Sequence, residues 1–277
     1  MILSDPGPAV VCGDRPHSTA TTPMRLLSFA VIFLASCAGT SSHCDPEFRI
    51  SASTPELSEV LADSVPPALR AVDTLPARRH VREIVIHAIE VPGTGYRGGS
   101  LPAEGSMELH FGSELRTHGW VVVRFLLTHE LVHLHLPEVW RKRLPHCVED
   151  GLADAIGLIA DPEARHYRLA EYVDALRPVF KDPELLESCR SGFDLDLATY
   201  VALDRERLVR LVAFGYTLVV CIGIPGIESL VERAEAEGVE RIPLDWFLEA
   251  FRGQDLPIED LPLMDCYVTI NQLRTKP

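Results

Sequence analysis

The segment His129-Glu130-Leu131-Val132-His133 determines how this sequence is interpreted. Two histidines four residues apart lie on one face of a helix, so both imidazoles can reach the same metal ion. Zn²⁺ suits two imidazoles and a carboxylate with a fourth position open for water, and it lowers the pKa of that water to about 7. The segment therefore predicts a zinc ion bound by His129 and His133, with Glu130 as the catalytic base that takes a proton from the water.

The residues around this segment are almost all apolar. A helix that is apolar on nearly every side must be buried, and three ionisable residues in its middle then need partners, which a metal ion supplies. We expect this helix to run from about Gly119 to Leu136, with Thr117 as its N-cap and Pro137 at its end. The apolar residues are Val121, Val122, Val123, Phe125, Leu126, Leu127, Leu131, Val132 and Leu134.

A second segment, from Leu144 to Asp154, begins the next expected helix, which runs from about Cys147 to Ile159. It carries two adjacent acids, Glu149 and Asp150, 16 and 17 residues beyond His133. A carboxylate near this position would supply the third zinc ligand.

Together the two segments resemble the gluzincin metallopeptidases, especially the bacterial peptidase-MA-like group, over about residues 105–160. In that group HExxH is followed by a stretch like Leu-Pro-x-Trp-Leu-x-Glu-Gly-Leu-Ala, whose Glu is the third zinc ligand. The resemblance implies an α+β, zincin-like fold, with a small β-sheet and an active-site helix followed by a mostly helical C-terminal part. It also implies hydrolysis of a peptide or protein substrate, in which Glu130 activates the water and then passes the proton to the leaving amine.

The sequence departs from this group at the third ligand. Without a gap, the family Trp falls on Cys147 and the ligand Glu falls on Asp150, whereas Glu149 is one residue out of register. Asp150 also has Asp154 at i+4, so one of this pair could bind the metal while the other holds a ligand histidine by its free N–H. We expect Asp150 to complete the metal shell and keep Glu149 as the alternative, because aspartate is one methylene shorter. A third interpretation places both acids in an exposed first turn favoured by the helix dipole.

Other histidines do not complete a metal site. The metzincin pattern requires Gly and a third His after HExxH, where this chain has Leu136 and Val139. His135 projects away from the His129 and His133 face, and His146 is expected in a surface loop. The residue that stabilises the transition-state oxyanion stays open, with Arg210, Tyr216 and Tyr200 as candidates.

The N-terminal region resembles an export signal. Met24-Arg25 precedes an apolar run, Leu26 to Ser36, whose 11 residues are too few to span a bilayer. Leu34-Ala35-Ser36-Cys37 resembles the bacterial lipobox, in which the Cys is acylated and becomes the first mature residue. We expect a lipoprotein signal peptide at 24–36 and a protein anchored through Cys37 in the bacterial cell envelope, in the periplasm or outer membrane. The alternatives are an ordinary secretory signal and a cytosolic protein with a buried N-terminal strand.

The rest of the chain forms one expected domain. Residues 1–23 fit no export pattern and are interpreted as a mis-called leader, with a disordered extension as the alternative. Residues 37–54 are expected to be a flexible tether. No repeat or strong linker divides residues 55–277, which we expect to be a single zincin-like metallopeptidase domain.

Composition agrees with a globular domain outside the nucleic-acid-binding classes. The net charge is −14 and the arginines are dispersed, whereas nucleic-acid binding requires a basic stripe. Setting aside Cys12 and Cys37, five cysteines remain, widely spaced and without CxxC, so they do not form a metal cluster. Cys221 lies in an apolar run and is expected to be a small buried hydrophobe.

Periodicity predicts the other elements. Pro55 to Ala71 predicts a helix that ends near Pro66-Pro67, and Val81 to Val91 and Ser106 to Phe111 predict strands. A loop is expected from Pro92 through Ser100. The strand Ser106–Phe111 is expected at the sheet edge, where an extended peptide could pair by main-chain hydrogen bonds. Beyond Arg165 the sequence predicts helices broken at Pro178, Pro183, Pro225 and Pro243.

Two functions follow from the sequence. The first is a zinc-dependent metallopeptidase. The second is a catalytically inactive zincin-fold surface lipoprotein that acts as a binding module. Glu130 favours the first, because a structural zinc site closes its fourth position with a ligand and needs no base.

Overall fold

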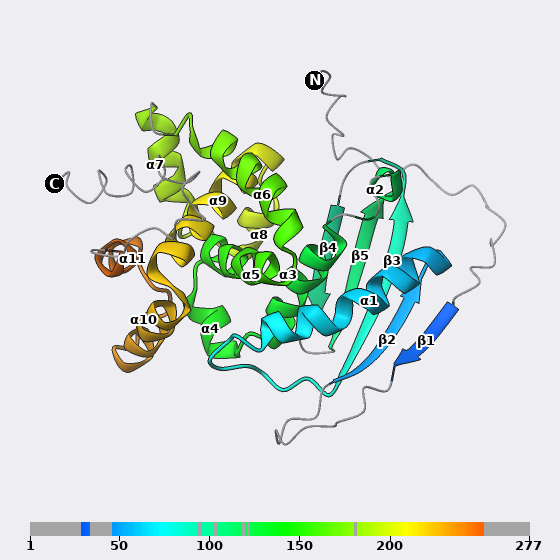
Figure 1. The fold of residues 1–277 in the computed structure, drawn as a ribbon. Coiled ribbons are helices and arrows are strands. Elements are labelled where there is room, and N and C mark those ends of the chain that lie inside the picture. The colour runs from blue at the N-terminus through cyan, green and yellow to red at the C-terminus, as the bar shows by residue number, and fades with distance from the viewer. Residues whose placement is uncertain are drawn as a thin grey trace, which may run out of the picture.

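The computed structural model describes residues 29–33, 46–93, 96–101, 105–117, 120, 122–179 and 182–251. A five-stranded sheet lies on one side and a group of helices on the other, which confirms the expected α+β class with a mostly helical C-terminal part (Figure 1).

No single helix in the described ranges is long and apolar enough to cross a membrane. One pair, Arg205–Ile222 with Ile224–Ala236, passes that test only together and is bent by 99°.

The sheet has the order β1-β2-β3-β5-β4. β2, β3 and β5 are parallel, and β1 and β4 pair antiparallel at the two edges. Alternate residues of the three parallel strands are buried, among them Ile50, Ile86 and Leu109. The bounds are β1 Phe29–Phe33, β2 Glu47–Ala52, β3 Glu83–Val91, β4 Tyr96–Leu101 and β5 Ser106–Gly112.

The sheet edge differs from the expectation. β5 lies between β3 and β4, so the prediction that Ser106–Phe111 forms an edge is wrong. The strand at this edge of the sheet is β4, although the sequence predicts a loop from Pro92 through Ser100. Its Gly98 and Gly99 have low strand propensity, but pairing with Leu109 and Glu108 of β5 supplies the main-chain hydrogen bonds.

The first helix, α1, spans Pro55–Val72 and lies across one face of the sheet (Figure 1). Thr54 caps it by accepting a hydrogen bond from the N–H of Leu57 at 3.2 Å. The expectation that it ends near Pro66-Pro67 is wrong, since the helix continues past both prolines. Apolar residues after the prolines, including Ala68 and Val72, are fully buried, and their packing offsets the hydrogen bonds that the prolines remove.

The helix that carries the HExxH segment is α3, Val123–His135, preceded by the short α2, Glu114–Thr117. It starts later than expected, and Thr117 ends α2 instead of capping α3. The N-cap is Val122, which has a left-handed φ of 74°, a conformation that costs about 1–3 kcal/mol in a non-glycine residue. The nearby Trp120 is buried, packs edge-on against Phe111 and donates its indole N–H to Glu56, so tertiary contacts determine where α3 begins.

A short helix that the sequence did not indicate, α4 at Glu138–Arg143, separates α3 from α5, His146–Ala160. The helix expected at Cys147–Ile159 is α5, and its two ends agree with the prediction to within one residue. The remaining helices are α6 Pro162–Leu176, α7 Pro183–Gly192, α8 Leu197–Val201, α9 Arg205–Ile222, α10 Ile224–Ala236 and α11 Leu244–Ala250. The expected breaks are confirmed, since Pro183 and Pro225 lie in the first turns of α7 and α10 and Pro243 precedes α11.

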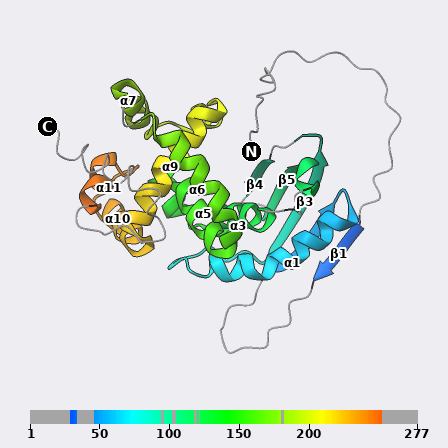
Figure 2. The same ribbon diagram turned by 45° about the horizontal axis from the view of Figure 1, so that its top comes forward.

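Two glycines let α5 and α9 pack backbone against backbone. A Cβ atom at Gly215 would lie 1.9 Å from the carbonyl oxygen of Cys147, and one at Gly151 would lie 2.3 Å from the backbone nitrogen of Tyr216. No side chain fits at either position. The crossing therefore fixes the position of α5, while α10 and α11 lie at the end of the molecule remote from the sheet (Figure 2).

The expected export signal is only partly within the described residues. Residues 1–28 and 34–45, which include Cys37, lie outside them. β1 falls inside the expected signal peptide and pairs with β2, so removal of that peptide would leave β2 as the edge of a four-stranded sheet. Cys147, Cys189 and Cys221 are buried, as expected for Cys221.

Candidate metal centre

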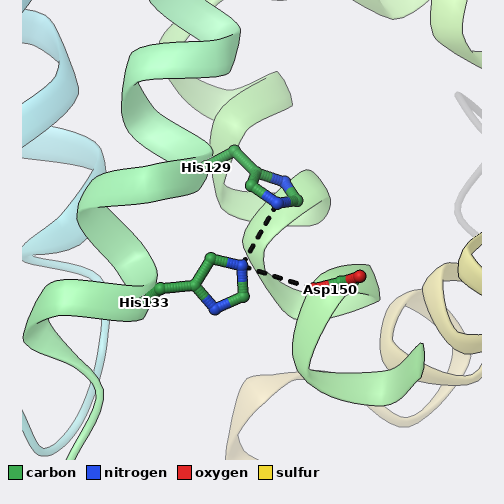
Figure 3. Close-up of side chains that lie close together, drawn as sticks. All are labelled: His129, His133 and Asp150. Carbon is green, nitrogen blue, oxygen red and sulfur yellow. Dashed lines mark hydrogen bonds and ion pairs between the residues drawn. The ribbon is translucent and has the colours of Figure 1, made fainter. Parts of the chain in front are cut away.

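The structure brings His129 and His133 of α3 together with Asp150 of α5 (Figure 3). The Nε2 atoms of the two histidines are 3.2 Å apart, and Oδ1 of Asp150 is 3.3 Å from Nε2 of His133. One ligand atom from each of the three residues lies within 4.8 Å of the others.

This donor set fits a tetrahedral metal ion. Zinc bonds of about 2.0–2.1 Å hold the ligand atoms of a tetrahedron about 3.3 Å apart, close to the two separations in this group. Two imidazoles and one carboxylate leave a fourth position for water. The chemistry of the three residues and two of their separations therefore fit Zn²⁺, and the third separation is within 4.8 Å.

Each histidine uses its other ring nitrogen to bind a carboxylate. Nδ1 of His129 is 2.6 Å from Asp154, and Nδ1 of His133 is 2.8 Å from Glu149. Such partners fix the ring orientation and leave Nε2 free for a metal. Glu149 thus lies behind His133, whereas Asp150 lies on the side of its Nε2 atom. Glu149 is buried and Asp150 is half-buried, so the interpretation of these two acids as an exposed first turn is wrong.

An arginine that sequence reasoning missed supports Asp154. Arg168 of α6 donates from Nε and Nη2 to Oδ2 of Asp154 at 3.2 and 2.9 Å, and its guanidinium lies over the ring of Tyr172. Burial would raise the pKa of Asp154, but the charges of Arg168 and His129 outweigh it and lower that pKa. No motif marks Arg168 in the sequence, since only the packing of α6 brings it to this carboxylate.

The same carboxylates change the pKa values of the histidines. Burial would lower the pKa of His133, but its hydrogen bonds to Asp150 and Glu149 raise it well above the ordinary value. Burial also lowers the pKa of His129, but the charge of Asp154 and the hydrogen bond to it raise this pKa. The net effect is a raised pKa. A metal ion at Nε2 must therefore displace protons, so the affinity of this site for metal falls as the pH falls.

The three residues lie where two hollows meet. An open cleft of about 830 Å³ is lined by His129, Glu130 and His133 together with Gly98 and Gly99 of β4. A second, more apolar hollow of about 530 Å³ also contains His129 and Asp150. Glu130 is 6% exposed and lines the first cleft together with the two histidines.

The candidate residues for the oxyanion and the two other histidines differ in their position relative to the cleft. Tyr200 lines the cleft, whereas Arg210 and Tyr216 are buried and are not among its lining residues. His135 is buried and its Nδ1 lies 3.1 Å from the carbonyl oxygen of Arg79, a structural role. The prediction that His146 lies in a surface loop is wrong. It is the first residue of α5 and lines the cleft.

Comparisons with known proteins are sparse. No protein-family model matches this chain, and no curated protein matches it. Among solved structures, the chain is similar to the crystal structure of an aminopeptidase N family protein from Idiomarina loihiensis, with 12% sequence identity and a TM-score of 0.46. The alignment covers 82% of this chain and 45% of that protein, so the chain spans less than half of its length.

Proposed function

We propose that this protein is a zinc-dependent metallopeptidase that hydrolyses peptide bonds. A single observation carries the proposal. Nε2 of His133 lies 3.2 Å from Nε2 of His129 and 3.3 Å from Oδ1 of Asp150. This group and Glu130 line one open cleft. His129, His133 and Asp150 are the proposed zinc ligands. This donor set with an adjacent carboxylate base is suited to attack of an activated water on a carbonyl.

The residues of the chain have separate roles in this mechanism. Zinc held by His129, His133 and Asp150 would polarise the substrate carbonyl and acidify the attacking water. Glu130 would accept the proton and deliver it to the leaving amine. Asp154 and Glu149 hold the two imidazoles with Nε2 toward the ion.

The edge strand β4 supports a peptide as the substrate. Gly98 and Gly99 line the cleft and are exposed, and a Cβ at Gly99 would meet no atom within 4 Å. An extended peptide can add to such an edge through main-chain hydrogen bonds. The proposed docking edge is therefore β4 and not Ser106–Phe111.

Zinc content and activity together test this function. Protein purified without chelator is expected to contain about one zinc per chain and to hydrolyse an unfolded protein such as casein. Removal of zinc with 1,10-phenanthroline should abolish hydrolysis, and added Zn²⁺ should restore it. Absence of bound metal would contradict the proposal. Bound zinc with no hydrolysis of a broad peptide mixture would favour the second function, an inactive zincin-fold binding module.

We also propose that the protein is exported and anchored by a lipid on Cys37. Cys37→Ser is expected to move the protein from the membrane fraction to the soluble fraction of cells, because it removes the acylated residue. Cys44→Ser, seven residues further on, is the matched control and should leave the protein in membranes. Equal membrane retention of both variants, measured by fractionation and immunoblotting, would point to an uncleaved signal or a partner protein instead.

A further inference from the structure

The two oxygens of Asp150 have different partners. Oδ1 lies 3.3 Å from Nε2 of His133, on the side of the proposed metal position. Oδ2 accepts a hydrogen bond of 2.8 Å from the hydroxyl of Tyr200 on α8. The two oxygens of a free carboxylate are equivalent. In Asp150 the hydrogen bond from Tyr200 distinguishes Oδ2 from Oδ1.

Tyr200 is itself held in place. Its side chain is buried, and its ring packs against His146 with the ring centroids 5.6 Å apart. Nε2 of His146 is 3.3 Å from Nη2 of Arg241. The guanidinium of Arg241 also donates a hydrogen bond from Nη1 to the carbonyl oxygen of Leu195. These contacts fix the ring of Tyr200 and therefore the direction of its hydroxyl.

The hydroxyl of Tyr200 remains a donor. It donates to Oδ2 of Asp150. Its single proton is used by Asp150, so the same proton is not available to an oxyanion in the cleft.

We propose that Tyr200 is the positioning residue for Asp150, and this rests on the metal site proposed above. Its hydroxyl holds Oδ2 and presents Oδ1 alone to the ion. A short aspartate has little freedom to correct its distance to a metal, so an external hydrogen bond that fixes its rotation has a direct effect on binding. In this role Tyr200 acts through the ligand and does not touch the substrate.

Tyr200→Phe tests the proposal, because it keeps the ring and removes only the donor. Zinc affinity, measured without substrate by competition with a chromogenic chelator, is expected to fall about 10–100-fold, as it does when groups behind a ligand are removed. Tyr167→Phe is the matched control. Tyr167 is exposed on α6, so the zinc affinity of this variant should equal that of the wild type.

The absorption spectrum of bound Co²⁺ gives a second readout, restricted to folded and loaded molecules. The d–d bands of Tyr200→Phe are expected to weaken, as when a carboxylate binds through both oxygens and raises the coordination number. Unchanged zinc affinity and an unchanged cobalt spectrum in Tyr200→Phe would overturn the inference, and a lower kcat with unchanged metal affinity would assign Tyr200 to the oxyanion instead. Failure of the wild type itself to bind either metal would contradict the proposed function.

Discussion

Glu130→Gln is expected to lower peptide hydrolysis by about 10²–10⁴-fold, the usual contribution of a general base. The substitution keeps the size and shape of the buried side chain and removes its negative charge and its ability to accept a proton. Glu130 is not among the three residues that form the metal group. Zinc content and the melting temperature should therefore equal those of the wild type.

The measurement is kcat/KM on a peptide substrate, with zinc per chain determined on the same preparation. Glu235→Gln removes the same charge from the exposed face of α10, away from the cleft, and should leave kcat/KM unchanged. If Glu130→Gln loses its zinc or keeps full activity, the base has been assigned to the wrong residue.

Asp150→Ala is expected to weaken zinc binding by more than about 100-fold, well beyond the loss in Glu149→Ala. Asp150 offers an oxygen 3.3 Å from Nε2 of His133, whereas Glu149 contacts Nδ1 on the other side of that ring. Loss of a group behind a ligand costs about 10–100-fold in metal affinity. That range is expected for Glu149→Ala and for Asp154→Asn, whose carboxylate orients His129.

Zinc affinities by chelator competition measure this order. Asp174→Ala, an exposed aspartate on α6, is the control for a general loss of negative charge and should bind zinc like the wild type. The opposite order, with Glu149→Ala losing the metal and Asp150→Ala keeping it, would return the third ligand to Glu149.

The sequence by itself determined the features that depend on local geometry. Helical spacing places His129 and His133 one turn apart, and i+4 spacing puts Asp150 and Asp154 on one face of α5. Alternation of apolar residues gave β3 and β5 to within about two residues, because each strand buries one face. These patterns repeat within a few residues, so no knowledge of distant contacts is needed to see them.

The tertiary structure decided what distant contacts control. β4 is a strand because β5 supplies its hydrogen bonds, although Gly98 and Gly99 disfavour one. Arg168 and Tyr200 belong to the site only because α6 and α8 pack against α5. The choice between Glu149 and Asp150 likewise depends on the rotation of α5 against α3, which the close contact of α5 with α9 at Gly151 and Gly215 fixes. Packing between elements far apart in sequence sets that rotation, and no local pattern encodes it.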